Sequence, residues 1–468
     1  MEIVLYPFAV IVVSILVFIW VERPYLLGGV ILFMLLYQFN IETPLPLDAR
    51  GLLTLSLFVR LYVFDKENML LINRNLLKNK YFWLLVAFIF IILVFPIIHS
   101  EKITKHLKTT FLAVINLIIG FLLVKTEDGR KALIFGILLA GILSAIDLIF
   151  TFSTTGSLLI IKVIDLILGR KLVLLNHNYP GLLSALGLLV IYFMWYRTKS
   201  NIVILILLSA LLSLGIIIST SRSALLGFFI VLFLATYFEY DMRHNLKKII
   251  PIGILLGMFL VGFFFIYNVF YVKSGSSSYI DKIYYRLYEE PFDMLTGKEL
   301  NKFDKYSGQR VEGSMTFRAN RWKKDLDKFM SLNLASQILG LGPKGYMKIA
   351  EKVYRKSGSL KYQLPSHNGY LLILMERGYL GLFLISFIFV FISFRAIKTT
   401  REINIVFPMI YILLVFIFYS FAQNSELTGS YTFLIIGSVL GNIIHTELEF
   451  DEEEFEEDIT EEELDITQ

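Results

Sequence analysis

Long runs of apolar residues recur along almost the whole chain, with few polar positions inside them. An α-helix needs about 20 mostly apolar residues to cross the hydrocarbon core of a bilayer. Only helices and closed barrels can cross, because every backbone polar group must be satisfied without water. The sequence therefore predicts an all-α, polytopic integral membrane protein with about 12–13 transmembrane helices. The predicted spans are Leu5–Trp20, Tyr25–Phe39, Gly51–Phe64, Tyr81–Ile98, Thr109–Val124, Ala132–Phe152, Pro180–Tyr196, Ile202–Ile218, Ala224–Tyr240, Ile249–Phe270, Tyr379–Phe394, Ile403–Phe421 and Thr432–Ile444.

These spans divide the chain into four parts. Residues 1–270 are expected to form an N-terminal transmembrane bundle, and residues 368–446 the C-terminal transmembrane helices. Residues 271–367 contain no long apolar run and form one large, mainly helical loop. Residues 447–468 are too charged to bury a core, so we expect a disordered cytoplasmic tail. The first span has no basic region before it and no small-residue cleavage site, which favours a retained helix over a signal peptide.

Lysine and arginine residues in the short loops predict the orientation, because such residues tend to remain cytoplasmic. Five basic clusters fall on one side when the spans alternate, and one, at Lys102, Lys105 and Lys108, falls on the other. We therefore expect a protein of the cytoplasmic membrane whose 271–367 loop faces the outside. The five clusters are Arg74, Lys78 and Lys80; Lys125, Arg130 and Lys131; Arg197 and Lys199; Arg243, Lys247 and Lys248; and Arg395, Lys398 and Arg401.

Composition excludes several classes of protein. The chain is 56% hydrophobic with a mean hydropathy of +0.68, which leaves too little polar surface for a soluble globule. It contains no cysteine, so disulfides, thiolate metal sites and thiol redox chemistry are excluded.

Charge is distributed unevenly along the chain. The net charge is +5, yet the tail at 447–468 holds 13 acids and no base. This tail is either a solvating extension or a segment that binds a partner. The outer loop holds 18 Lys and Arg against 10 Asp and Glu. No nucleotide or nucleic acid is available on the outer face, so we expect the loop to attract lipid diphosphates; the alternative is simple adhesion to anionic membrane lipids.

Two outward-facing features contain arginine. Ser219–Gly227 reads Ser-Thr-Ser-Arg-Ser-Ala-Leu-Leu-Gly and places Arg222 between two apolar helices with almost no loop around it. Such an arginine either has a function or extends to the lipid headgroups. In the outer loop, Arg318 and Trp322 share one predicted helical face, with Arg321 beside them. This helix is expected to present guanidinium groups beside an aromatic anchor.

Two further features lie nearer the C-terminal spans. Gly340–Tyr346 is a turn-forming run that lacks the spacing of a Walker A phosphate loop. Pro365–Leu371 leads into a span and puts His367 at the outer membrane surface. A single histidine there is more often a polar interface residue, but a neutral imidazole can also act as a general base. The pair Asp325 and Asp327 follows two lysines, and we expect a solvated helix face rather than a metal site.

In this order and on one side, these features resemble the O-antigen ligase and O-antigen polymerase (Wzy-like) superfamily of bacterial membrane glycosyltransferases. The family often has proline where this chain has His177, so no catalytic role is assigned to that histidine. The matching elements are the paired asparagines Asn176 and Asn178, Ser-Arg-Ser-Ala at Ser221–Ala224, Arg-x-x-x-Trp at Arg318 and Trp322, Gly-x-Gly-Pro at Gly340–Pro343, His-Asn-x-Tyr-Leu at His367–Leu371, and Glu-x-Gly-x-x-Gly at Glu376–Gly381.

The resemblance implies a GT-C-like helical fold and transfer of a saccharide from undecaprenyl diphosphate to an acceptor hydroxyl, without a metal or other cofactor. Arg222 and Arg318 are the expected catalytic counter-charges for the leaving diphosphate, because guanidinium groups match phosphate oxygens. His367 is the expected base that deprotonates the acceptor, which predicts inversion at the anomeric carbon. The expected substrate-binding residues are Arg321, Trp322, Asn178, Ser221, Asn368 and Tyr370.

The motifs leave the acceptor open, because ligases and polymerases share them. The composition, rich in Lys, Ile and Phe, indicates an AT-rich genome, and a bacterium without an outer membrane has no lipopolysaccharide core to glycosylate. We therefore expect a polymerase of capsule, exopolysaccharide or O-antigen repeat units, with a chain-length regulator or other polysaccharide-assembly protein among its expected partners. The alternatives are a ligase and a transporter or flippase of lipid-linked sugars, although the chain has no internal repeat of the kind common in transporters.

Overall fold

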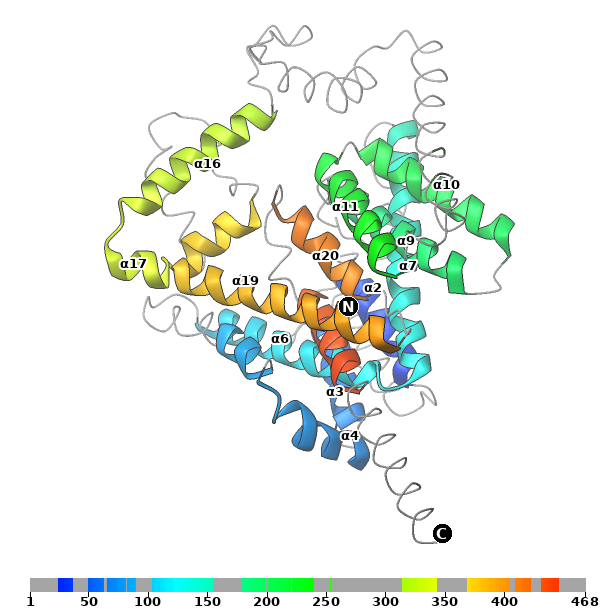
Figure 1. Cartoon of the computed structure of the whole chain (residues 1–468), viewed down its shortest axis with the longest axis horizontal. Helices are drawn as coiled ribbons and strands as arrows, with labels where there is room; N and C mark the ends of the chain where they lie inside the picture. The colour runs from blue at the N-terminus through cyan, green and yellow to red at the C-terminus, as the bar shows by residue number, and fades with distance from the viewer. Residues whose placement is uncertain are drawn as a thin grey trace, which may run out of the picture. The chain divides into compact units, whose positions relative to one another are not determined.

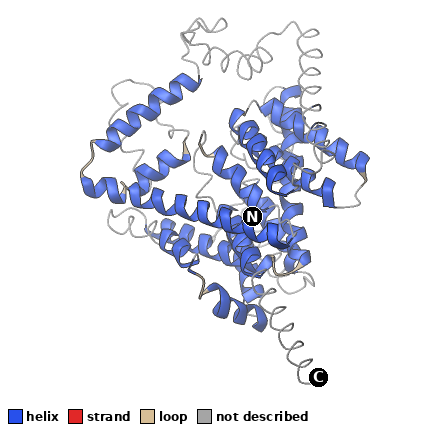
Figure 2. Cartoon of the chain, in the orientation of Figure 1, coloured by secondary structure: helices blue, strands red, loops and turns tan. Residues whose placement is uncertain are grey.

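The computed structural model describes most of the predicted spans and part of the predicted outer loop (Figure 1). Within the described residues every regular element is a helix and no strand is present, which confirms the all-α class (Figure 2). The described residues are 24–36, 49–62, 65–80, 82–89, 103–154, 178–197, 201–219, 221–239, 253, 257, 314–342, 368–403, 409–421 and 431–445.

Each labelled helix follows an apolar run or a capped polar segment of the sequence. They are α2 (Pro24–Leu36), α3 (Ala49–Tyr62), α4 (Lys66–Leu71), the π-helix η1 (Ile72–Leu76), α6 (Ile103–Leu123), α7 (Glu127–Thr154), α9 (Asn178–Arg197), α10 (Ile202–Ser219), α11 (Arg222–Glu239), α16 (Ser314–Met330), α17 (Leu334–Leu339), α19 (Gly369–Ile403) and α20 (Met409–Tyr419).

Four of the described helices are long and apolar enough to cross a membrane, which confirms a polytopic membrane protein. Each of them, and each shorter apolar helix, overlaps a predicted span. The four are Glu127–Ile149, Asn178–Trp195, Ile202–Ser219 and Gly369–Thr399; the shorter helices are Tyr25–Leu36, Thr110–Leu123, Arg222–Phe238, Met409–Tyr419 and Tyr431–His445. The span predicted at Leu5–Trp20 lies outside the described residues, so the total number of spans stays a prediction.

The helix α19 differs most from its predicted span. It begins at Gly369, ten residues before the predicted start at Tyr379, and it continues through a kink at Gly378. The polar pair Glu376 and Arg377 interrupts the apolar run. For this reason the apolar pattern did not predict the first turns of the helix, from Gly369 to Gly378. Of the predicted span Ile403–Phe421, the structure describes α20 (Met409–Tyr419), whereas residues 404–408 lie outside the described residues.

The chain forms two compact units, each built from segments that are distant in the sequence. Unit 1 comprises Met1–Gly136, Phe383–Leu413 and Thr428–Gln468, and unit 2 comprises Ile137–Leu382 and Leu414–Leu427.

Unit 1 packs its helices through small residues. Gly29 on α2 lies against the backbone of Ala132. A Cβ built on Gly29 would lie only 2.8 Å from the Ala132 carbonyl carbon. Gly437, on the helix Tyr431–His445, approaches the backbone of Leu117 on α6 in the same way. Lipid offers no hydrophobic force that drives helices together, so close contact between small residues supplies the attraction.

Unit 2 is organised around α9. Its residues from Asn178 to Phe193 are all buried, and the helix packs against both α10 and α11. A helix that is apolar on all sides is stable only where protein or lipid surrounds it completely. Here Gly187 meets Gly141 of α7, and a Cβ built on Gly215 of α10 would lie only 2.7 Å from both Ala145 and Ser184.

Replacement of Gly215 by valine should destabilise unit 2, because the added methyl groups collide with α7 and α9. Overpacking of a close interface costs about 1–3 kcal/mol, and we expect a lower melting temperature in detergent. The matched control is Gly253→Val, since a Cβ built on Gly253 meets nothing within 4 Å. Equal melting temperatures for the two variants would contradict the packing described here.

Candidate functional site

The turn between α10 and α11 is fixed by its own serines. Ser219 Oγ donates to the Ile216 carbonyl (2.6 Å) and accepts from the Ser221 amide (3.2 Å). Ser221 Oγ accepts from the Ala224 amide at 3.4 Å and lies 3.3 Å from Ser223 Oγ. Serine oxygens at this position replace the missing helical partners of the first amides of a helix. As a result α11 begins at Arg222 itself, with almost no loop before it.

The first turn of α9 lies against this serine turn. Gly181 has no side chain, and a Cβ built there would lie 2.6 Å from Ser219 Cβ and 3.2 Å from Ser221 Cβ. Asn178 begins the same helix one turn earlier and is buried. The structure therefore brings three predicted site residues, Asn178, Ser221 and Arg222, to one end of unit 2.

A second group of predicted residues lies at the start of α19. Asn368 Oδ1 accepts from the Leu371 amide at 3.0 Å, which caps the helix. The Gly369 amide donates to the Ser420 carbonyl at 2.7 Å, and the Tyr370 hydroxyl donates to the Ile417 carbonyl at 3.0 Å. The Tyr370 ring also packs against Phe421, with centroids 4.5 Å apart. These contacts hold the start of α19 on the last turn of α20; His367, the residue before Asn368, lies outside the described residues.

The helix α20 connects the two groups. Gly227 of α11 packs on its last turns, with a built Cβ 3.5 Å from the Val415 carbonyl oxygen and 3.6 Å from Phe418 Cβ. Arg222 precedes Gly227 by five residues, or roughly 7.5 Å along the helix axis. Because the start of α19 is bound to the same end of α20, both predicted groups belong to the same end of unit 2.

The helix α16 confirms the predicted helical face and corrects one expectation. Arg321 Nε lies 3.7 Å from Asp325 Oδ2, and these side chains are only 3% and 2% exposed. The prediction that Asp325 belongs to a solvated face was wrong, although Asp327 is exposed. The next residue on the Arg321–Asp325 row, Phe329, packs into a core with Leu371, Leu374 and Met375 of α19. Arg321, Asp325 and Phe329 therefore all lie on the buried side of α16.

An open groove of about 370 Å³ lies between α16 and the start of α19. Three predicted substrate-binding residues, Trp322, Asn368 and Tyr370, line it together. Lys323 also lines the groove, but it was not part of the motifs recognised in the sequence. Its position directly after Trp322 on an amphipathic helix is the sequence feature that could have indicated this. Arg222, Asn178 and Ser221 do not line this groove. The lining residues are Trp322, Lys323, Leu326, Asn368, Tyr370, Leu371, Leu374 and Leu382.

A clasp of two backbone hydrogen bonds holds the segment after α17 on α19. The Leu341 amide donates to the Met375 carbonyl at 2.9 Å, and the Gly342 amide donates to the Glu376 carbonyl at 3.0 Å. These carbonyls are available because α19 kinks at Gly378, which has φ 65° and ψ −168°.

Glycine is required on both sides of this clasp. Gly340 has φ 84°, and Gly378 lies so close to α17 that a Cβ would stand 2.6 Å from the Gln337 carbonyl oxygen. Side chains rarely adopt such backbone angles and would also collide here. The glycine-rich run thus serves the packing of α16 and α17 on α19.

Replacement of Gly378 by alanine should open the clasp, because alanine adds both backbone strain and a collision with α17. We expect hydrogen exchange at the Leu341 and Gly342 amides to accelerate by at least about tenfold, the effect of ~1.4 kcal/mol. The control Gly257→Ala, at a position where a built Cβ meets nothing within 4 Å, should leave these amides protected. Unchanged exchange in Gly378→Ala would argue against the clasp.

Comparison with known families identifies one match. Residues 207–386 match the family model described as O-antigen ligase. The matched segment begins within α10 and includes α11, α16, α17 and the first half of α19, which together carry the serine turn, the groove and the clasp. No curated protein matches the chain at a significant level. The match over residues 207–386 supports the resemblance to the O-antigen ligase and polymerase superfamily that the motifs predicted.

Proposed function

We propose that this protein is a polymerase that joins undecaprenyl-diphosphate-linked oligosaccharide repeat units on the outer face of the cytoplasmic membrane. The match of residues 207–386 to the O-antigen ligase family model supports a membrane enzyme of the ligase or polymerase type. The groove between α16 and α19 is the observation that carries the finer proposal. It combines an apolar wall, an aromatic ring and a cation beside the residue that follows His367.

The groove has the chemistry of an amphiphile that carries a diphosphate. Leu326, Leu371, Leu374 and Leu382 form an apolar wall for a prenyl chain. On α19 the wall extends from Leu371 to Leu382, or roughly 16 Å of helix, which suits a long chain better than a compact sugar. Lys323 is exposed at this groove, where an ammonium group can pair with a phosphate oxygen.

Arg318 and Arg222 complete the proposed recognition of the diphosphate. Arg318 lies one turn before Trp322 on α16, and Arg222 begins α11. Arg321 is less suited to this task than the sequence predicted, because Asp325 already pairs with it in a buried setting. We therefore assign Arg321 to holding α16 in place, and the binding of the leaving group to Arg318, Arg222 and Lys323.

The proposed reaction is a single displacement. An acceptor hydroxyl oxygen attacks the anomeric carbon of the lipid-linked saccharide while the bond from that carbon to the diphosphate oxygen breaks. The hydroxyl proton passes to the imidazole of His367, and the diphosphate leaves with the bonding electron pair and remains attached to its prenyl chain. Arginine side chains stabilise the charge that develops on the diphosphate, and attack from the opposite side inverts the anomeric carbon.

The acceptor in this proposal is the sugar of a second lipid-linked repeat unit. The composition indicates an AT-rich genome, and a bacterium without an outer membrane has no lipopolysaccharide core for a ligase to glycosylate, which favours a polymerase. Incubation of the purified protein with lipid-linked repeat units alone tests the choice. A ladder of longer lipid-linked products supports the polymerase, whereas product that forms only after a separate acceptor is added would favour the ligase.

Replacement of His367 by alanine should abolish most of the extension activity, because loss of a general base slows transfer by about 10²–10⁴-fold. The measurement is the rate at which lipid-linked oligosaccharide is extended in reconstituted membranes. Lys328→Gln, an exposed change at the end of α16 and outside the groove, is the control and should retain activity. Extension by His367→Ala at the wild-type rate would refute the assignment of the base.

Adjacent lysines allow a matched test of the groove. Lys323 lines the groove and Lys324 does not, although both are exposed on α16. Lys323→Gln should raise the KM for the lipid-linked donor by about tenfold, the effect of ~1.4 kcal/mol, and should reduce the dependence of KM on salt. Lys324→Gln should leave KM near the wild-type value. Similar KM values for the two variants would show that the groove does not bind the diphosphate.

A further inference from the structure

A short surface helix of unit 1 has a regular inward and outward face. The α-helix α4 continues directly into the π-helix η1, since Leu71 and Ile72 at the junction both have right-handed helical angles. Asp65 caps the start, where its Oδ1 accepts from the Asn68 amide at 3.1 Å. Every fourth side chain is buried: Asn68 is 0% exposed, Ile72 3% and Leu76 0%.

The opposite rows of this helix combine apolar and cationic side chains. One residue after each of the buried positions Asn68, Ile72 and Leu76 comes a first row, which consists of Met69, Asn73 and Leu77. Two residues after each comes a second row, which consists of Leu70, Arg74 and Lys78. Met69, Leu70 and Leu77 are 37%, 48% and 37% exposed, and Arg74 and Lys78 are exposed beside them. The Leu77 amide donates to the Ile72 carbonyl at 2.9 Å, which closes one wider π-turn. This turn keeps the buried and exposed rows aligned along the helix over successive turns.

Trp83 extends this face beyond the helix. Its Nε1 donates to the Leu77 carbonyl at 2.6 Å, and the side chain is 53% exposed. Lys80 lies between the two and is exposed. Tryptophan with a bonded indole N–H and an exposed ring is typical of the boundary between lipid and water. We call the set Met69, Leu70, Arg74, Leu77, Lys78, Lys80 and Trp83 the basic face.

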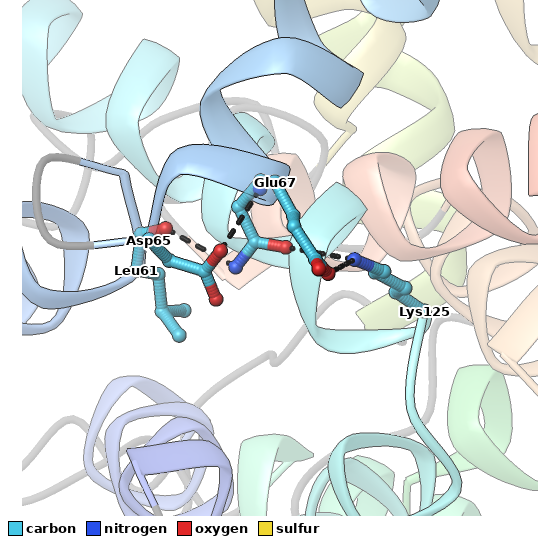
Figure 3. A network of polar contacts seen from close by, with 5 residues as sticks. Leu61, Asp65, Glu67 and Lys125 are labelled. Atoms are coloured by element: carbon cyan, nitrogen blue, oxygen red, sulfur yellow. Dashed lines mark hydrogen bonds and ion pairs between the residues drawn. The ribbon is translucent and has the colours of Figure 1, made fainter.

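Glu67, the acid nearest to the basic face in the sequence, is paired with another element. Lys125 Nζ lies 3.5 Å from Glu67 Oε2 and 3.4 Å from Asn68 Oδ1, and Asn68 Nδ2 donates to the Leu61 carbonyl at 3.1 Å (Figure 3). Glu67 therefore faces the turn between α6 and α7. From Asn68 to Ser100 the sequence contains no Asp or Glu, so the segment that carries Arg74, Lys78 and Lys80 has a net positive charge.

We propose that the basic face binds an anionic glycerophospholipid of the surrounding leaflet. Its apolar side chains would contact the acyl chains, and Arg74, Lys78 and Lys80 would contact the phosphate and a further anionic headgroup. An amphiphile satisfies both kinds of side chain at once. The face also lies between two predicted spans, Gly51–Phe64 and Tyr81–Ile98, which places it beside a bilayer surface. This binding is independent of the glycosyl transfer proposed above.

The test compares lipid retention by full-length variants. The protein is reconstituted in nanodiscs of phosphatidylcholine with added phosphatidylglycerol, and the lipids retained after release are counted by native mass spectrometry. The variant Arg74→Gln, Lys78→Gln, Lys80→Gln should retain phosphatidylglycerol about tenfold less well than the wild type. The charge-conserving variant Arg74→Lys, Lys78→Arg, Lys80→Arg should retain it normally, which separates loss of charge from loss of fold.

A second triple variant controls for total charge. Lys102→Gln, Lys105→Gln, Lys108→Gln removes three positive charges from the start of α6 and the residue before it, and should retain phosphatidylglycerol like the wild type. Equal losses in both triple variants would overturn the proposal, because the preference would then follow net charge alone. The proposal also fails if the first triple variant keeps its phosphatidylglycerol but no longer binds a synthetic peptide of residues 447–468, since the face would then serve the acidic segment.

Discussion

The attachment of α19 to the last turn of α20 is the contact on which the candidate site depends. Asn368 caps the helix, the Gly369 amide binds the Ser420 carbonyl, and the Tyr370 hydroxyl binds the Ile417 carbonyl. Each of these three consecutive residues makes its own hydrogen bond, through a side-chain amide, a backbone amide and a hydroxyl group respectively. The start of α19 therefore has little freedom to rotate or slide on α20. His367, which we propose as the general base, immediately precedes them in the sequence, and a general base must be held within hydrogen-bond distance of its substrate. The same turn of α20 packs against Gly227, which ties Arg222 to this end of unit 2.

Glycines determine how closely the outer helices approach α19. The kink at Gly378 leaves the Met375 and Glu376 carbonyls to accept bonds from Leu341 and Gly342, and the backbone angles there suit glycine alone. The clasp keeps α17, and α16 before it, against the wall of the groove. The ion pair of Arg321 and Asp325 also keeps α16 in this position, because separating a buried guanidinium from its carboxylate would leave two unpaired buried charges. Backbone geometry and one buried pair thus position Trp322 and Lys323.

The two proposed lipid sites use one chemical principle at different places. In the groove, Lys323 stands beside an apolar wall; on the basic face, Arg74 and Lys78 stand beside Met69, Leu70 and Leu77. A cation adjacent to apolar side chains matches an amphiphile with an anionic head. The difference lies in shape. The groove is a concave surface between two helices, which suits a specific substrate. The basic face lies along one continuous segment, from α4 through η1 to Trp83, and suits a lipid of the surrounding bilayer.

By itself, the sequence determined the helical class, the position of most described spans and the resemblance to the O-antigen ligase family, because each depends on local patterns: the length of an apolar run, or a motif of a few residues. It also predicted that Arg318 and Trp322 share a helix. Only the tertiary structure decided that Asp325 is buried with Arg321, that Lys323 lines the groove, and that Leu341 and Gly342 clasp α19. Helical spacing shows which residues share a face, but the face that becomes buried depends on a partner helix distant in the sequence. For the same reason the early start of α19 escaped prediction, since its first turns are held by α20 and α17 rather than by their own apolar pattern.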